Sequence, residues 1–118
     1  MGVTVLIVDD HPSFRASART LLEAEGYKVI GEAENGETAV STARELQPDL
    51  VLLDVQLPGI DGFAVADQLR KLEDPPVVIL TSSRDGADYG RCIDDCGAHG
   101  FVPKAELSGA AIAAFFAA

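Results

Sequence analysis

Residues 50–54 of the chain read Leu-Val-Leu-Leu-Asp, so that four consecutive apolar residues run directly into a carboxylate. A short continuous apolar run is typical of a strand buried on both faces, as in a parallel sheet covered by helices. Residues 5–8, Val-Leu-Ile-Val, repeat the pattern and are followed by Asp9 and Asp10. The sequence therefore predicts two buried strands, each with acidic residues at its carboxyl end.

Further short apolar runs alternate with segments of helical periodicity along the chain. This alternation predicts an α/β fold with a parallel sheet and helices on both faces. The expected strands are residues 3–8, 27–33, 50–53, 77–80 and 100–103. Apolar stripes at helical spacing lie within residues 14–22, 40–46, 63–69, 89–96 and 107–116. The second strand is the most polar and is therefore expected at an edge of the sheet.

Capping signals indicate where these helices begin and end. Ser13 is expected to cap the first helix, and Gly26 is expected to end it. Pro48 is expected to end the second helix, and the prolines at positions 75 and 76 are expected to end the third. The last helix is expected to begin near Leu107 or Ser108.

Composition limits the classes of protein to consider. The 118 residues, 47% of them hydrophobic, suit one domain with a single core. The net charge of -10 argues against direct binding of nucleic acid, whose phosphates it would repel. No signal-like start or membrane-spanning run is seen, which predicts a cytoplasmic protein without membrane contact. Cys92 and Cys96 are interpreted as free thiols, because two cysteines this close do not form a disulfide framework.

Asp9, Asp10 and Asp54 follow strand ends at which ligands bind in doubly wound sheets. If the two strands are neighbours, three carboxylates converge and repel one another unless a cation is present. Mg²⁺ takes oxygen ligands and is commonly held by one or two carboxylates. The sequence therefore predicts a Mg²⁺ site, although either Asp9 or Asp10 alone could instead cap a helix.

Two further strand ends carry polar groups that suit an anion. The fourth strand is expected to run into a loop that contains Thr81, and the fifth ends at Lys104. Taken singly, a threonine here is more often a turn residue and a lysine is more often a solvated surface charge. Together with the carboxylates they supply metal ligands, a nucleophile, a hydroxyl and a cation. This combination indicates a phosphoryl-transfer site.

Five segments carry a resemblance to a known family. They are residues 6–12 (LIVDDHP), 49–54 (DLVLLD), 57–62 (LPGIDG), 79–82 (ILTS) and 97–104 (GAHGFVPK). In this order and spacing they resemble the receiver domain of two-component response regulators, particularly the branch in which a helix-turn-helix output domain follows. The resemblance covers residues 1–118 as one receiver domain, with no output domain inside the chain. It implies a flavodoxin-like (βα)5 fold whose five parallel strands lie in the order 2-1-3-4-5.

The resemblance also implies chemical roles. Asp54 would accept a phosphoryl group from a sensor histidine kinase or a small acyl phosphate. Asp9, Asp10, Asp54 and the backbone carbonyl of Gln56 would hold Mg²⁺. The expected function is a signalling switch that regulates transcription and is not a general enzyme. Its altered surface would control a C-terminal DNA-binding output domain outside this chain, or would bind a second copy of the domain as a homodimer.

Thr81 and Lys104 would bind the phosphoryl oxygens, and Thr81 and Phe101 would form the switch. The sequence departs from the family pattern directly after Lys104 and at Phe101. Many receivers have a proline joined in cis after the lysine, where this chain has Ala105. Phe101 lacks the hydroxyl of the common tyrosine, so a switch that needs this donor does not apply.

Two other classes of protein fit parts of the pattern. A phosphatase of the haloacid dehalogenase type also uses an aspartate at a strand end, but it normally has a second acid two residues later, where Gln56 stands. A flavin-binding or structural flavodoxin-like module shares the expected fold. The acidic cleft and the lack of a glycine-rich loop after the first strand argue against a flavin phosphate.

Overall fold

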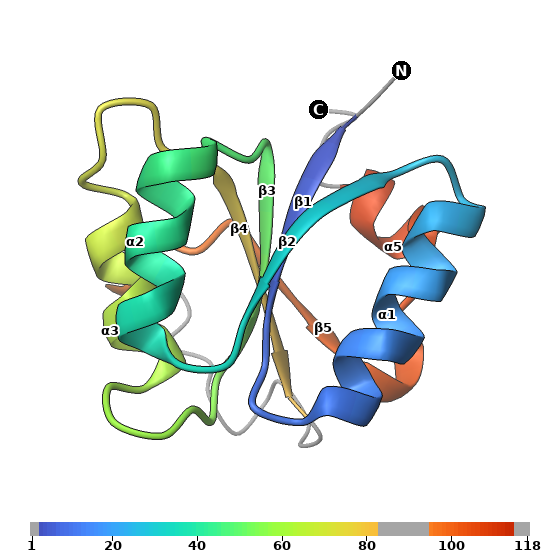
Figure 1. Cartoon of the computed structure of the whole chain (residues 1–118), viewed down its shortest axis with the longest axis horizontal. Helices are drawn as coiled ribbons and strands as arrows, with labels where there is room; N and C mark the ends of the chain where they lie inside the picture. Colours follow the sequence, from blue (N-terminus) through green and yellow to red (C-terminus); the bar gives the residue numbers. More distant parts are fainter. Residues whose placement is uncertain (1–2, 83–94, 115–118) are drawn as a thin grey trace.

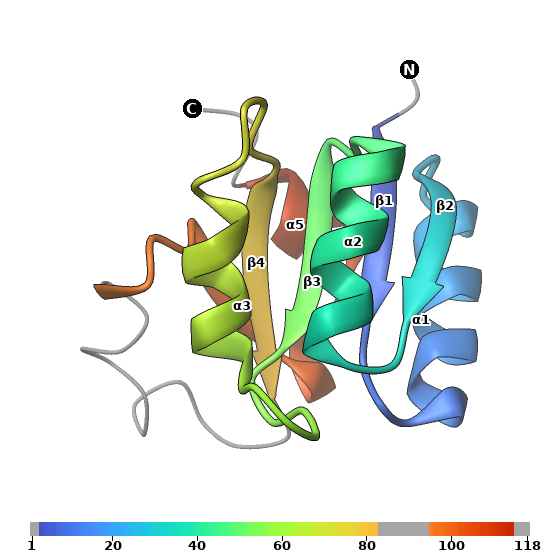
Figure 2. The same cartoon turned by 60° about the vertical axis from the view of Figure 1, so that its left-hand side comes forward.

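The structure, a computed structural model, describes residues 3–82 and 95–114 of the chain. Neighbouring strands pair in parallel and form one sheet in the order β2-β1-β3-β4-β5. The strands are β1 (Thr4–Val8), β2 (Lys28–Ala33), β3 (Leu50–Asp54), β4 (Val77–Ser82) and β5 (Gly100–Pro103). The predicted strand order is confirmed, and the more polar β2 lies at one edge of the sheet, as Figure 2 shows.

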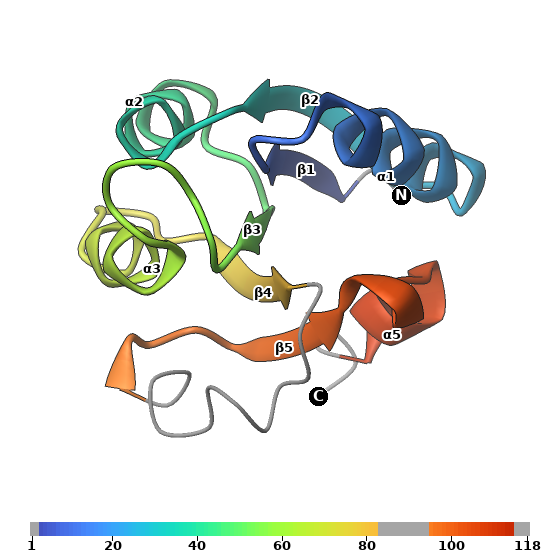
Figure 3. The ribbon, with the colours of Figure 1, turned by 90° about the horizontal axis from the view of Figure 1, so that it is seen from below.

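Helices cover both faces of the sheet. They are α1 (Pro12–Ala24), α2 (Gly36–Leu46), α3 (Gly62–Leu69) and α5 (Gly109–Ala113). Helices α2 and α3 lie on one face, and α1 and α5 lie on the other (Figures 1 and 3). The doubly wound α/β prediction is therefore confirmed. Most of the helix expected within residues 89–96, and both Phe115 and Phe116, lie outside the described residues.

Alternation along the strands divides the core between these two faces. In β1, Leu6 and Val8 pack in the cluster that includes α2 and α3, whereas Val5 and Ile7 pack in the cluster that includes α1 and α5. The apolar residues of β3 alternate in the same way, and all of these side chains are almost fully buried. Each such side chain contributes about 1.5–3 kcal/mol by leaving water. Burial on both faces is why residues 5–8 and 50–53, which precede the aspartates, are all apolar.

The start of α1 differs from the prediction. His11 is the N-cap residue without a side-chain capping bond, and Pro12 is the first helical residue. Proline suits this position because its φ is already helical and its missing N–H would have no partner within the helix. Ser13 therefore lies inside the first turn, and the prediction that it caps the helix is wrong.

The end of α3 also differs from the prediction. The helix ends at Leu69, with Arg70 as its C-cap residue, well before the prolines at positions 75 and 76. The amides of Lys71 and Leu72 donate to carbonyls three residues earlier, which tightens the last turn and ends the helix. Leu72 then packs against the core cluster of α2 and α3. This packing of Leu72, which the positions of the prolines do not indicate, determines where α3 ends.

The other predicted helix ends are confirmed. Gly26, at φ 93°, follows the C-cap residue of α1, and Gln47 caps α2 just before Pro48. Ser108 caps α5 by accepting a hydrogen bond from the amide of Ala111 at 3.0 Å. Helix α5 thus begins at Gly109, one residue after the later of the two expected starts.

Among the described residues no peptide bond is cis, so the bond from Lys104 to Ala105 is trans. These residues begin the short 3₁₀ helix η2 (Lys104–Glu106), which follows β5 directly. Cys96 is buried and forms no disulfide bond among the described residues, as predicted, whereas Cys92 lies outside them. Within residues 3–82 and 95–114, none of the helices combines the length and the apolar character needed to cross a membrane.

Candidate functional site

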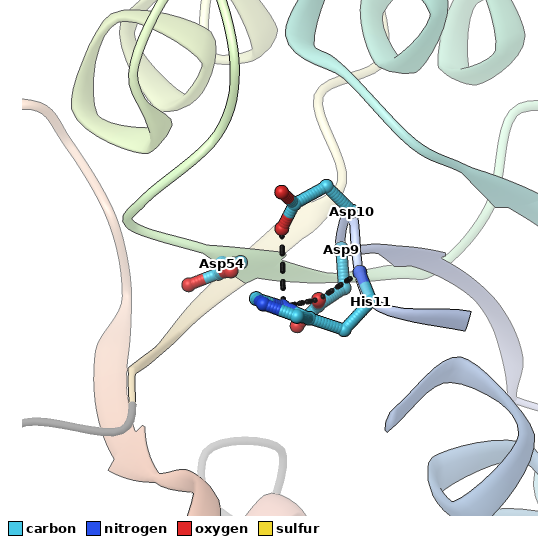
Figure 4. A group of neighbouring side chains, drawn as sticks. All are labelled: Asp9, Asp10, His11 and Asp54. Carbon is cyan, nitrogen blue, oxygen red and sulfur yellow. Dashed lines mark hydrogen bonds and ion pairs between the residues drawn. The ribbon is translucent and has the colours of Figure 1, made fainter. Parts of the chain in front are cut away.

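The carboxyl ends of β1 and β3 bring three acidic side chains and one imidazole together. One ligand atom from each of Asp9, Asp10, His11 and Asp54 lies within 4.8 Å of the others (Figure 4). Asp9 and Asp54 are buried, whereas Asp10 and His11 are exposed. The neighbouring strands therefore place two carboxylates inside the protein and two further donors at its surface.

Backbone contacts hold Asp9 in one orientation. Its Oδ1 accepts a hydrogen bond from the backbone amide of His11 at 2.8 Å and lies 2.9 Å from the ring Nδ1 of the same residue. Its backbone carbonyl accepts a hydrogen bond from Nη1 of Arg15, and its amide donates to Ala33. Since His11 is the N-cap residue of α1, neither Asp9 nor Asp10 caps this helix. The capping alternative for these two residues is therefore wrong.

Lys104 supplies the positive charge of the site. Its Nζ lies 2.6 Å from Oδ2 of Asp9 and 3.5 Å from Oδ2 of Asp54, and it also lies 4.4 Å from the centre of the Phe14 ring. Oδ2 of Asp9 is buried and accepts no hydrogen bond in the described part of the chain. The ion pair with Lys104, which lacks hydrogen-bond geometry, is what compensates this charge. One ammonium therefore serves two buried carboxylates.

The close approach of α3 shapes the third side of the site. Asp61 caps α3 by accepting from the amide of Ala64, and the amide of Gly62 donates to the carbonyl of Val55 at 2.8 Å. A Cβ atom on Gly62 would overlap the backbone carbonyl of Asp54. Glycine is thus required here, because any side chain would push the helix away from the end of β3.

Burial makes Asp54 easier to protonate. Loss of solvent raises the pKa of its carboxyl, and the negative charge of Asp9 raises the pKa further. The amide of Gln56, which donates to Oδ1 at 3.1 Å, and the ammonium of Lys104 act in the opposite direction without cancelling the effect of burial. In the absence of another cation, ionised Asp54 therefore costs the folded state free energy.

This cost predicts how stability depends on pH. In buffer at pH 7 that contains a metal chelator, Asp54→Asn is expected to raise the free energy of unfolding. The reason is that the wild-type carboxyl has a raised pKa, so its ionised form destabilises the folded state. As the pH falls through the raised pKa, wild-type Asp54 binds a proton and the advantage of the variant should shrink. Urea unfolding of both proteins between pH 7 and pH 4 measures this difference. A difference that stays constant or grows toward acid would contradict the direction of the shift.

Thr81 and Phe101 lie on β4 and β5, the next two strands of the sheet after β3. Thr81 pairs with Asp54 in the β3–β4 ladder, and its carbonyl accepts from the amide of Val55. The prediction that Thr81 begins a loop is wrong, because β4 continues to Ser82 through pairing with β5. Phe101 is half-buried in β5 and packs against the cluster of α2 and α3.

Sequence reasoning missed three residues of the site. His11 lies in the segment of residues 6–12 but received no role, although its position directly after the acidic pair was a usable signal. Phe14 was assigned only to the apolar stripe of the first helix; it does pack in that core and also lies beneath Lys104. Arg15 gave no signal in the sequence, because its partners Glu32 and the carbonyl of Asp9 become neighbours only in the fold.

The donors present fit a divalent cation. Within the described residues, three carboxylates gather where Lys104 pairs with two of them, and a buried carboxylate oxygen of Asp9 accepts no hydrogen bond. Oxygen donors of this kind suit Mg²⁺, which needs few protein ligands and keeps several waters. The contact of Gln56 that the structure describes is the one from its amide; a ligand role for its carbonyl stays a prediction.

Comparisons with known proteins agree with this arrangement. A family model for the response regulator receiver domain matches residues 5–114. The DNA-binding transcriptional activator EvgA of Escherichia coli K12 is 37% identical over 116 residues, which are 98% of this chain and 57% of EvgA. The chain spans about half the length of the curated relatives it matches, from 49% to 57% in the first of them.

Two solved structures are similar over nearly all of the chain. One is a LuxR-family two-component response regulator from Aurantimonas, with 30% identity, a TM-score of 0.88, and coverage of 98% of this chain and 86% of the other. The second is the signal receiver domain of a response regulator called NarL from Mycobacterium tuberculosis, with 34% identity and a TM-score of 0.88. The match covers 99% of this chain and 98% of that one.

Proposed function

The chain belongs to the response regulator receiver domain family, and we propose that it works as a phosphorylation switch with Asp54 as the acceptor. The observation that carries this proposal is the pairing of a buried carboxylate with a partly buried cation. Asp54 is almost fully buried at the end of β3, and Lys104 places its ammonium 3.5 Å from Oδ2. A nucleophilic oxygen and a charge that can bind the incoming phosphoryl group thus occupy the same site.

The reaction transfers one phosphoryl group. A carboxylate oxygen of Asp54 attacks the phosphorus of a phosphohistidine on a sensor kinase, or of a small acyl phosphate. The bond from phosphorus to the leaving nitrogen or oxygen breaks, and the leaving group keeps the electron pair. Asp54 then carries an acyl phosphate. The protein modifies itself and does not turn over a general substrate.

Positioning and charge are the means by which proteins promote this kind of transfer. Asp9, Asp10, Asp54 and the carbonyl of Gln56 would hold Mg²⁺, which when bound would offset negative charge on the phosphoryl oxygens. Lys104 would bind a phosphoryl oxygen by turning from Asp54 toward the new group. Thr81, the ladder neighbour of Asp54, would offer its hydroxyl.

The switch would start at Thr81 and continue to Phe101. A phosphoryl group on Asp54 adds charge and acceptor oxygens next to Thr81. Movement of Thr81 would change the space beside β5, where Phe101 packs against the cluster of α2 and α3. The domain would thereby shift its population between two packings. An output domain or a second copy of the domain would bind the altered surface.

The relatives suggest what this surface controls. EvgA is described as a DNA-binding transcriptional activator and is longer than this chain. By analogy, the switch would regulate transcription through a DNA-binding domain outside residues 1–118, in the cytoplasm, with a histidine kinase as phosphoryl donor. The family match favours this function over a dehalogenase-type phosphatase or a flavin-binding module.

The direct test is phosphorylation of the purified chain. Incubation with acetyl phosphate and Mg²⁺ should add one phosphoryl mass, and hydroxylamine should remove it because acyl phosphates are labile to this nucleophile. Intact-protein mass spectrometry measures both steps. A chain that gains no mass, or a modification that survives hydroxylamine, would contradict the proposed function.

Binding of Mg²⁺ should stabilise the fold by mass action. We expect Mg²⁺ to raise the melting temperature, since it relieves repulsion between Asp9 and Asp54. Asp10→Asn should weaken Mg²⁺ binding about tenfold or more by removing an exposed ligand. Isothermal titration calorimetry measures the affinities, with Asp67→Asn, an exposed carboxylate on α3, as the control. Equal affinities in wild type and in the double variant Asp9→Asn, Asp10→Asn would rule out this metal site.

A further inference from the structure

His11 lies among the carboxylates of the site although it has no part in the function proposed above. Its Nδ1 is 2.9 Å from Oδ1 of Asp9 and 3.1 Å from Oδ1 of Asp10. Figure 4 shows dashed lines from the ring to both of these side chains, with Asp54 near them. One ring nitrogen thus lies within 3.1 Å of an oxygen from each of two carboxylates.

A metal ion fits between three atoms placed in this way. When each metal–ligand bond is about 2.1 Å, adjacent ligands lie about 3 Å apart in octahedral geometry and about 3.4 Å apart in tetrahedral geometry. The separations of Nδ1 from the two carboxylate oxygens are close to these values. A further donor, Asp54, completes a group whose ligand atoms all lie within 4.8 Å of one another.

Two other observations describe how the imidazole and the carboxylate of Asp9 are held. The backbone amide of His11 donates to Oδ1 of Asp9, and Pro12 starts α1 directly afterwards, so the chain carrying the imidazole is held beside the carboxylate. Asp9 is fully buried, and its Oδ2 lacks a hydrogen bond in the described part of the chain. Lys104 compensates one side of this carboxylate, and Oδ1, on the other side, faces the imidazole.

We propose that His11 is a nitrogen ligand of this metal site and makes it receptive to a borderline divalent transition ion such as Zn²⁺. Mg²⁺ prefers oxygen ligands, whereas imidazole suits zinc, copper, iron and nickel. An ion bound through His11 would occupy carboxylates that Mg²⁺ also needs, so the two ions compete. The inference deepens the proposed function, because it rests on the same metal site at Asp9, Asp10 and Asp54.

The first test compares two ions in the same variant. Wild type and His11→Gln, stripped of metal with a chelator, are titrated separately with Zn²⁺ and with Mg²⁺ by calorimetry. The ratio of Zn²⁺ to Mg²⁺ affinity should fall at least tenfold in His11→Gln, because only Zn²⁺ gains from the imidazole. Asp67→Asn should keep the wild-type ratio. A ratio in His11→Gln equal to that of wild type would overturn the proposal.

A second test detects the nitrogen ligand directly. Cu²⁺ bound to wild type at one equivalent should show nitrogen coupling in its electron paramagnetic resonance spectrum, and His11→Gln and His11→Asn should lose it. Coupling that persists in both variants would assign the nitrogen to another group and overturn the proposal. The His11 side chain is 62% exposed, so both variants should fold, which circular dichroism checks.

Failure of this inference can be distinguished from failure of the proposed function. Phosphorylation of Asp54 is measured in wild type with Mg²⁺ alone and does not involve Zn²⁺ or Cu²⁺. Normal labelling together with an unchanged affinity ratio would remove the role of His11 and keep the switch. Absent labelling together with a tenfold fall in the ratio would keep the ligand role and remove the switch.

Discussion

Asp54→Asn is expected to abolish the gain of a phosphoryl mass from acetyl phosphate and Mg²⁺. An amide has no anionic oxygen with which to attack phosphorus, and the replacement keeps the shape of the buried side chain. The variant should also fold at least as well as wild type, because it removes a carboxyl whose pKa is raised by burial. A loss of labelling therefore cannot be attributed to unfolding.

The measurement is intact-protein mass spectrometry at several times of incubation. Asp67→Asn is the matched control, since it makes the same chemical change on an exposed part of α3 where Arg70 and Lys71 are the partners. It should be labelled at the wild-type rate. Labelling of Asp54→Asn at more than a few percent of that rate would assign the acceptor to another residue.

In buffer that contains a metal chelator, Lys104→Met is expected to lower the free energy of unfolding by about 3 kcal/mol. Methionine keeps the length of the side chain but leaves the buried carboxylate of Asp9 without the ammonium that now lies 2.6 Å away. Phosphorylation should also fall sharply, because the cation beside Asp54 is lost. Mg²⁺ should restore more stability to this variant than to wild type, since it would then be the main charge that compensates the carboxylates.

Urea unfolding with and without Mg²⁺ measures these effects. Lys71→Met is the control, because Lys71 forms an exposed ion pair with Asp67. Its stability should change by less than about 0.5 kcal/mol. A comparably small effect of Lys104→Met would mean that Asp9 does not depend on the ammonium, and the proposed electrostatic balance of the site would have to be abandoned.

Local sequence patterns were sufficient for most of the fold. The apolar runs of β1 and β3 identify strands that are buried on both faces, because no polar side chain is acceptable there. The more polar second strand correctly indicated an edge. The signals at Gly26 and Pro48 also placed helix ends correctly, since they act through the backbone of the residues concerned.

Helix and strand ends that depend on contacts between distant segments were predicted less well. Serine is a residue type that often caps helices, as was expected of Ser13. Proline prefers the first helical position, however, so α1 begins at Pro12. The prolines at positions 75 and 76 cannot continue a helix, yet α3 ends earlier in a tightened turn. Strand β4 continues through Thr81 because β3 and β5 both pair with it there.

The sequence by itself determined which carboxylates meet, because Asp9, Asp10 and Asp54 follow strands whose carboxyl ends share one edge of a parallel sheet. Only the tertiary structure decided how their charges are balanced. The ammonium of Lys104 above the ring of Phe14, and the imidazole of His11 between two carboxylates, are contacts set by side-chain direction. Spacing along the chain fixes where a strand ends, whereas the direction of a side chain depends on the packing of elements distant in sequence.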